Sequence, residues 1–209
     1  MVNVGGARSA LVFLVRCFVA FHFSIFCVAY AQVYYPNQRV GIGDLPLLTA
    51  GSKDPSDVLL TSVEIVFHDK AICCGRDSAL VDRVQQGDPR SLKDVAEKLQ
   101  GGYRLSDGRS VVISAEYVPA PSVNSGQLVS DLTEKHAMLM AWNSHLYVIY
   151  GVVYDASIDY SSGGRMYTIR KFLLVDPRFS GQRRQVSLDR QTDEWDKVQG
   201  VLTLKDVSQ

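Results

Sequence analysis

Two apolar segments joined by a pair of polar residues set the strongest limit on the fold. AMLMAW (137–142) is followed by Asn143-Ser144 and then by HLYVIYGVVYD (145–155). Apolar and β-branched runs on both sides of a two-residue polar connection predict two antiparallel strands with a tight turn. The second run is apolar on both faces, which predicts a central strand that is covered on both sides.

The remaining elements place helices before most of the sheet. Helices are expected at 76–86, at 91–100 with Ser91 as the cap and Gly101 as the stop, and at 126–135. Strands are expected at 58–67, 103–114 (a hairpin around Asp107-Gly108), 166–177 and 200–207. This order predicts an α+β fold in which N-terminal helices pack against an antiparallel β-sheet.

The N-terminal segment 1–31 has the features of a secretory signal peptide. Two arginines and no acidic residue accompany an apolar run that closes with Ala29-Tyr30-Ala31. A basic start, an apolar middle and a small-residue site are typical of a cleaved signal. We expect cleavage after Ala31, a secreted or periplasmic protein, and no stable membrane insertion after cleavage. The alternative is an uncleaved anchor, because the run is long enough to span a bilayer.

The residues that follow divide into an arm and a domain. Segment 32–57 contains three prolines and several glycines, so an irregular N-terminal arm is expected there. Residues 58–209 are of a length that suits one α+β domain. The formal net charge is zero and no basic stripe is present, which argues against a nucleic-acid partner.

Cysteine usage is the first indication of chemistry. The whole chain contains four cysteines, and only Cys73 and Cys74 lie beyond the expected signal. Neighbouring cysteines close a ring too small to restrain the chain, so a disulfide framework is excluded. A reactive thiol, a metal ligand or an ordinary buried cysteine remain.

Three residues in order form a set suited to hydrolysis by a thiol. Cys74 is expected at the start of a helix, where the helix dipole favours a thiolate. His145 begins the predicted central strand, and Asp176 ends the next one. A thiolate nucleophile, an imidazole base and a carboxylate that orients the imidazole make up a cysteine-hydrolase triad.

These motifs resemble the papain-like cysteine peptidases, in particular the bacterial branch that includes the bacteriocin-leader peptidases. The matching patterns are Cys74-Gly75, HLYVIYGVVYD led by His145, and VDPR with Asp176, within roughly 58–178. The resemblance implies a papain-like fold and an exported hydrolase that cleaves a peptide (amide) bond in a peptide or protein substrate. It implies no cofactor and no metal.

One position departs from that family pattern. The family places a glutamine six residues before the nucleophile, where its amide binds the oxyanion. Here that position holds His68, whose N–H is able to donate in the same role. Counting from Cys73 instead reaches Phe67, which has no donor, so Cys74 is the expected nucleophile.

Several alternatives stay open. The histidine strand is also similar to that of cell-wall peptidases, and His68 in place of glutamine fits a scaffold that binds without catalysis. A metal site of Cys73, Cys74, His68 and His145 is disfavoured, because adjacent cysteines rarely share one tetrahedral ion. His136 is expected to cap a helix C-terminus and to have no chemical role.

Overall fold

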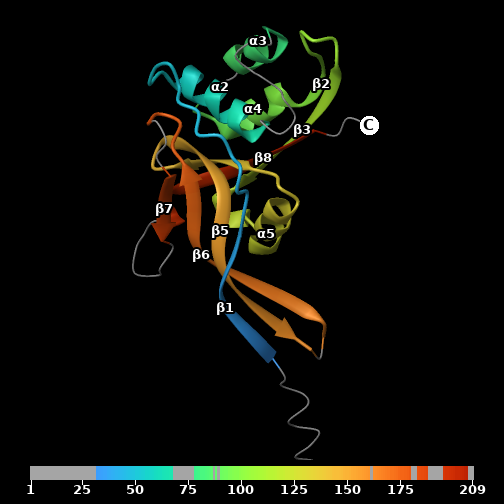
Figure 1. Cartoon of the computed structure of the whole chain (residues 1–209), viewed down its shortest axis with the longest axis vertical. Helices are drawn as coiled ribbons and strands as arrows, with labels where there is room; N and C mark the ends of the chain where they lie inside the picture. Colours follow the sequence, from blue (N-terminus) through green and yellow to red (C-terminus); the bar gives the residue numbers. More distant parts are fainter. Residues whose placement is uncertain are drawn as a thin grey trace, which may run out of the picture. The chain divides into compact units, whose positions relative to one another are not determined.

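The computed structural model describes residues 32–67, 78–86, 88, 90–160, 162–179, 183–187 and 195–206. Within them the protein is α+β, with an antiparallel sheet and few helices (Figure 1). The chain divides into two compact units, Met1–Pro36 with Ala156–Met166, and Asn37–Asp155 with Tyr167–Gln209. The second unit contains all four α-helices of the described residues and both predicted site residues that the structure describes.

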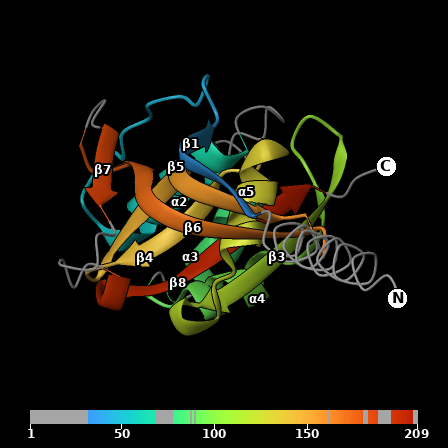
Figure 2. The ribbon, with the colours of Figure 1, turned by 90° about the horizontal axis from the view of Figure 1, so that it is seen from below.

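The sheet contains eight strands among the described residues. Its order is β2-β3-β8-β4-β5-β6-β7, and β1 pairs with β5 off this path. Figure 2 shows the sheet from below, with β4 beside β8, its partner in the sheet. The strands are β1 (Gln32–Gly41), β2 (Gly101–Arg104), β3 (Ser110–Pro119), β4 (Met138–Trp142), β5 (His145–Asp159), β6 (Gly164–Val175), β7 (Arg183–Ser187) and β8 (Val198–Asp206).

The helices are short, and three of them pack together. They are α2 (Pro55–Val66), α3 (Ser78–Gln86), α4 (Leu92–Leu99) and α5 (Ser125–Thr133), with 3-10 turns η2 (Ala120–Ser122) and η3 (Trp195–Lys197). Helix α3 contacts both α2 and α4. Helix α2 also contacts β4, and helix α4 contacts β3 and β8. The predicted arrangement of helices against an antiparallel sheet is therefore present at this coarse level.

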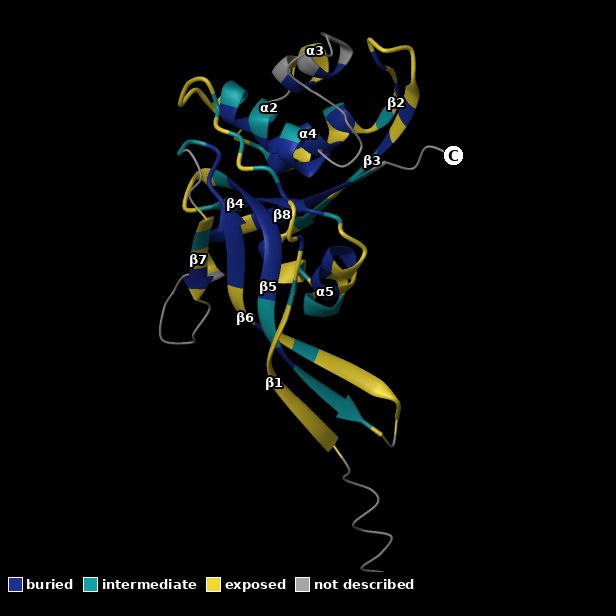
Figure 3. Ribbon diagram, in the orientation of Figure 1, coloured by how far each residue is buried: buried dark blue, intermediate teal, exposed yellow. Residues whose placement is uncertain are grey.

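The predicted hairpin at 137–155 is confirmed. Trp142 pairs with His145, and the two turn residues Asn143 and Ser144 have φ of 49° and 62°. Two positive φ angles in a two-residue turn fit the right-handed twist of the flanking strands. The turn fixes His145 as the first residue of β5. As expected, β5 is central and its residues from Tyr147 to Val152 are buried (Figure 3).

Local capping and turn chemistry also account for α4 and for the hairpin of β2 and β3. The Ser91 side chain accepts a hydrogen bond from the backbone N–H of Asp94 at 3.2 Å, which is the predicted cap. Gly108 takes φ of 88° in the β2–β3 turn. The helix expected at 126–135 is α5, which begins one residue earlier and ends at Thr133.

The strand predicted at 58–67 is wrong, because this segment belongs to α2. The side chain of Asp54 caps the helix by accepting from the Ser56 N–H at 2.9 Å, and Pro55 occupies its first turn. The buried positions recur with a helical repeat rather than by alternation. They are Val58, Leu59, Ser62, Val63, Ile65 and Val66.

The irregular arm predicted at 32–57 is wrong in its first ten residues, which form β1. The Ile42 N–H donates to the Tyr150 carbonyl at 2.8 Å, just beyond the residues of β5 that pair with β4. Gly41 and Gly151 permit this pairing, since a Cβ on Gly151 would lie 2.7 Å from the Val40 carbonyl oxygen. Residues 42–54 contain no helix or strand. Strand β7 is a further element that the sequence reading missed.

Candidate functional site

The structure describes two of the four predicted site residues. His145 begins β5, and Asp176 follows Val175, the last residue of β6. Cys74 and His68 lie outside the described residues, as does Cys73. Because β5 and β6 are neighbours joined by a short connection, the start of β5 and the end of β6 lie at the same end of the sheet. The two predicted residues are therefore brought to one region.

His145 lines a pocket of about 340 Å³. The β4–β5 hairpin supplies one side of the pocket and the start of α2 supplies another. Arg90 and Leu92 come from the start of α4 and the residues before it, and single residues come from the turn after β6 and from β8. Apolar, neutral polar and cationic side chains share the lining, and none of its described residues is a carboxylate. The lining residues are Lys53, Pro55, Val58, Arg90, Leu92, Ala141, Ser144, His145, Leu146, Arg178 and Gln199.

A second hollow of about 230 Å³ adjoins the first. The two share four lining residues, namely Arg90, Leu92, Ala141 and Gln199. The second hollow extends to Lys93 and Tyr117, and the part of its lining that the structure describes also has no carboxylate. We call the two together the His145 groove.

The Asp176 carboxylate is bound by Arg178. Its Oδ1 accepts from Nε of Arg178 at 2.8 Å and from the Arg178 backbone N–H at 3.1 Å, and its Oδ2 accepts from Nη2 at 2.7 Å. Nε of Arg184 lies 3.6 Å from Oδ2. Among the described residues no hydrogen bond joins Asp176 to His145, so the imidazole-orienting bond expected of a triad is not formed there. Asp176 acts on His145 through its charge.

The charges around His145 favour its neutral form. Partial burial of the imidazole lowers the pKa of His145, and the positive charges of Arg178 and Arg184 lower it further. The Asp176 carboxylate acts in the opposite direction and is outweighed. His145 is therefore available at neutral pH to accept a proton.

The pKa of Asp176 reflects a similar competition. Burial raises it, but the hydrogen bonds and positive charge of Arg178, with the charge of Arg184, outweigh burial and hold the pKa below its ordinary value. The hydrogen bond to Asp176 in turn raises the pKa of Arg178. The ion pair is thus stably charged.

Arg178 is the residue of this site that the sequence reading missed. Its Nη2 also donates to the Tyr147 hydroxyl at 3.0 Å, and its guanidinium lies 5.3 Å from the centre of the Tyr147 ring. The Asp-Pro-Arg order carried the available signal, because an aspartate side chain commonly accepts from the backbone N–H two residues later in a turn.

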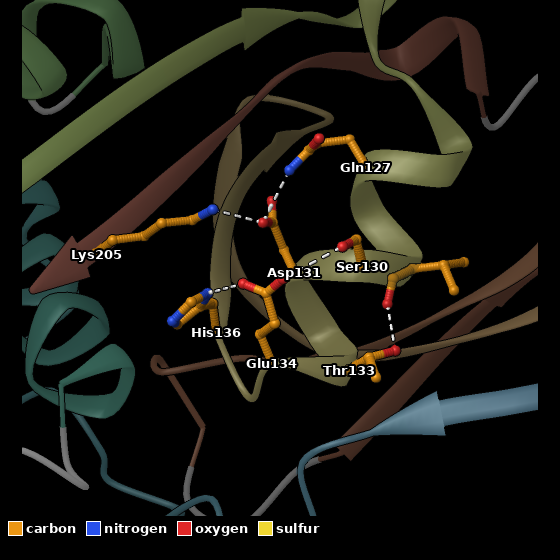
Figure 4. Close-up of polar contacts among 8 residues, drawn as sticks. Gln127, Ser130, Asp131, Thr133, Glu134, His136 and Lys205 are labelled. Atoms are coloured by element: carbon orange, nitrogen blue, oxygen red, sulfur yellow. Dashed lines mark hydrogen bonds and ion pairs between the residues drawn. The ribbon is translucent and has the colours of Figure 1, made fainter.

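A separate polar cluster lies at the end of α5 (Figure 4). Oδ1 of the buried Asp131 accepts from Lys205 at 2.7 Å and from Gln127 at 3.0 Å. Nδ1 of His136 lies 3.6 Å from a Glu134 oxygen and is buried without a hydrogen-bond partner. Asp131, Glu134 and His136 are spaced so that they could hold a metal ion. The Lys205 ammonium already neutralises Asp131, so the donor set fits an ion poorly.

His136 was expected to cap the C-terminus of a helix, and it lies just beyond α5. The capping hydrogen bond comes from its backbone and not from its side chain. The backbone N–H of His136 donates to the Asp131 carbonyl at 2.8 Å, which satisfies a carbonyl of the last turn of α5.

No helix within the described residues is long and apolar enough to cross a membrane.

The fold and the site together define an α+β protein with a cation-lined groove around a histidine. Comparison with known protein families, with curated proteins and with solved structures finds no match to this chain.

Proposed function

We propose that the protein is a papain-like cysteine hydrolase that cleaves a peptide (amide) bond outside the cytoplasm. Cys74 is the nucleophile, His145 the general base, Asp176 the acidic partner and His68 a donor to the oxyanion. The observation that carries the proposal is the position of His145 in a pocket, next to Asp176, with its pKa lowered. This is the state a base needs at neutral pH.

In the proposed reaction His145 takes the proton of the Cys74 thiol as the sulfur attacks the substrate carbonyl carbon. The oxyanion then formed is stabilised by N–H donors, to which His68 contributes. Collapse of the intermediate breaks the C–N bond, and the imidazolium returns its proton to the leaving amine. Water, deprotonated by His145, then hydrolyses the thioester and regenerates the thiol.

The Asp176–Arg178 pair supports a modified role for the acidic partner. Since both carboxylate oxygens accept from Arg178, Asp176 would stabilise the imidazolium through its electric field. The same observation favours the second candidate, a papain-like scaffold that binds a peptide without cleaving it. In that scaffold the carboxylate would serve the fold alone.

Active-site labelling separates the two candidates. The full chain is treated near pH 6 with a peptide that carries a chloromethyl ketone, and the labelled cysteine is identified by peptide mapping. An ordinary thiol with a pKa of ~8.5 is almost wholly protonated at this pH and reacts slowly. We expect rapid labelling of Cys74, unchanged labelling in Cys73→Ala, and labelling slowed about a hundredfold in His145→Ala, in line with loss of a general base.

Slow and equal labelling of both cysteines, unaffected by His145→Ala, would favour the binding scaffold. Preferential labelling of Cys73 would contradict the choice of nucleophile. The Cys73→Ala variant is the matched control, because it removes a thiol one residue away.

A further inference from the structure

Among the described residues, the His145 groove is lined by cations and by no carboxylate. Lys53 and Arg90 line its first hollow, and Arg90 and Lys93 line the second. Lys53 and Arg90 make no ion pair with any carboxylate of the described residues. Lys93 has only an exposed contact of 4.0 Å with Glu97, which contributes little. Nζ of Lys53 also lies 5.1 Å from the centre of the Phe179 ring, a cation–π contact that leaves its charge in place. The positive charges of Lys53 and Arg90 are therefore not neutralised by a carboxylate of the described residues.

The acidic residues closest in sequence to Lys53 and Arg90 accept hydrogen bonds from backbone N–H groups or from a hydroxyl. Asp54 caps α2, Asp57 accepts from the Ser52 hydroxyl at 2.5 Å, and Asp88 accepts from the Arg90 N–H at 2.9 Å. None of these carboxylates lines the groove. Partial burial of the imidazole is the main cause of the lowered pKa of His145, and the positive charges of Arg178 and Arg184 lower it further.

The groove also has an apolar floor. Val58, Leu92 and Leu146 line the first hollow together with Ala141. Its two hollows extend from His145 to Tyr117, and the first is near the lower end of the volumes of ligand pockets, about 300 Å³. Apolar surface with separated cations suits an extended peptide that carries both apolar and acidic groups.

We propose that the His145 groove binds a carboxylate-bearing peptide segment, with Lys53 and Arg90 pairing with its carboxylates. This inference rests on the proposed function for the choice of a peptide as ligand, and it adds that acidic groups flank the bond presented to His145. The carboxylate is supplied either by an acidic side chain or by a peptide C-terminus.

The test measures binding without turnover. The full chain carrying Cys74→Ala is titrated into three fluorescein-labelled octapeptides of glycine, alanine and leucine, followed by fluorescence anisotropy. One contains two glutamates and an amidated C-terminus. The second contains two glutamines and a free C-terminus, and the third contains two glutamines and an amidated C-terminus. We expect the glutamate peptide or the free-C-terminus peptide to bind about tenfold more tightly than the third, the effect of one charge-assisted hydrogen bond.

Charge-matched variants locate the site. In Arg90→Gln and Lys53→Gln the preference for carboxylate should fall about fivefold, as expected for loss of one close charge pair. Arg104→Gln and Lys171→Gln remove the same charge from exposed positions outside the groove and should leave it unchanged. An equal loss in all four variants would overturn the proposal, because it would show a response to net charge alone.

Four other outcomes are decisive. Equal affinity for the three peptides, or tighter binding of a single-stranded oligonucleotide than of any peptide, would overturn the groove proposal. Carboxylate-selective binding without cleavage by the wild-type chain would support the groove proposal while contradicting the hydrolase. Cleavage by the wild type with no preference for acidic peptides would contradict the groove proposal alone.

Discussion

Asp176 and Arg178 form a bidentate ion pair in the turn that follows β6, with the Asp176 side chain wholly buried and the Arg178 side chain only 14% exposed. The guanidinium also lines the pocket that contains His145. This pair therefore links the stability of the sheet end to the charge of the proposed catalytic base.

Removing Arg178 should destabilise the fold. Arg178→Gln would leave the Asp176 carboxylate buried with Arg184 as its only described cation, at 3.6 Å. Loss of one partner from a buried pair costs about 3 kcal/mol, which we expect as the fall in the free energy of unfolding. Urea denaturation measures it. The double variant Asp176→Asn/Arg178→Gln is the control and should recover much of the loss; no recovery would show that Arg178 acts through packing on Tyr147.

Acid should weaken the protein through Asp176. Its pKa is lower in the folded chain than the ordinary value of 3.8, so the folded state binds fewer protons than the unfolded state in this range. The stabilisation is complete above the ordinary pKa and is lost as the pH falls through the lowered one. Unfolding free energies measured from pH 6 down to pH 2 should fall more steeply in the wild type than in Asp176→Asn. Parallel curves would refute the assignment.

His145 should titrate below the ordinary histidine value of 6.5. Arg184→Gln removes one of the cations that lower its pKa, while leaving the Arg178–Asp176 bonds in place, so the pKa of His145 should rise in that variant. Histidine ring signals followed by NMR across pH 4 to pH 8 provide the measurement. A fall in the His145 midpoint would contradict the charge assignment.

The contact of β1 with β5 predicts an asymmetric response to two alanine substitutions. In Gly151→Ala the new methyl group would lie 2.7 Å from the Val40 carbonyl oxygen and 3.1 Å from Leu173, so the backbones must separate. We expect a loss of about 2 kcal/mol in unfolding free energy, typical of overpacking. Gly43→Ala meets nothing within 4 Å and is the matched control. Equal stability of the two variants would show that β1 is not held as described.

The proposed export has a direct chemical test. If the segment 1–31 is a cleaved signal, N-terminal sequencing of the protein from the extracytoplasmic fraction should begin at Gln32, the residue after Ala29-Tyr30-Ala31. An intact N-terminus in the membrane fraction would instead identify an anchor. Ala31→Asp, which places a charge at the cleavage position, should block processing.

The sequence predicted those elements whose signals are local. The Asn143-Ser144 turn and the Ser91 cap each satisfy a backbone requirement within a few residues, and both are present. The strand predicted for segment 58–67 was wrong because a short apolar run fits a buried helix as well as a strand. The flanking Asp54-Pro55 would have decided for a helix, since Asp caps and Pro begins one.

The site was predictable only in part for a related reason. His145 and Asp176 could be placed because each sits at the end of a recognisable strand. The cations of the groove could not, since Lys53, Arg90 and Arg178 come from separate loops that meet only in the folded chain. No periodic pattern in the sequence indicates that these three loops lie close together in the folded chain.

The place of β8 in the sheet has a consequence for how the chain reaches its native state. This strand, the last one described along the chain, lies between β3 and β4, pairing with both, and its Gln199 lines the His145 groove. Until residues 198–206 have been synthesised, the strands β2–β3 and β4–β7 form two separate parts of the sheet. The edges of β3 and β4 that pair with β8 are then without that partner. Closing the gap between them requires contacts far apart in sequence, which are slow to form. The Gln199 side of the groove would therefore be completed late, and a nascent chain that has not reached β8 would be exposed to aggregation along both edges.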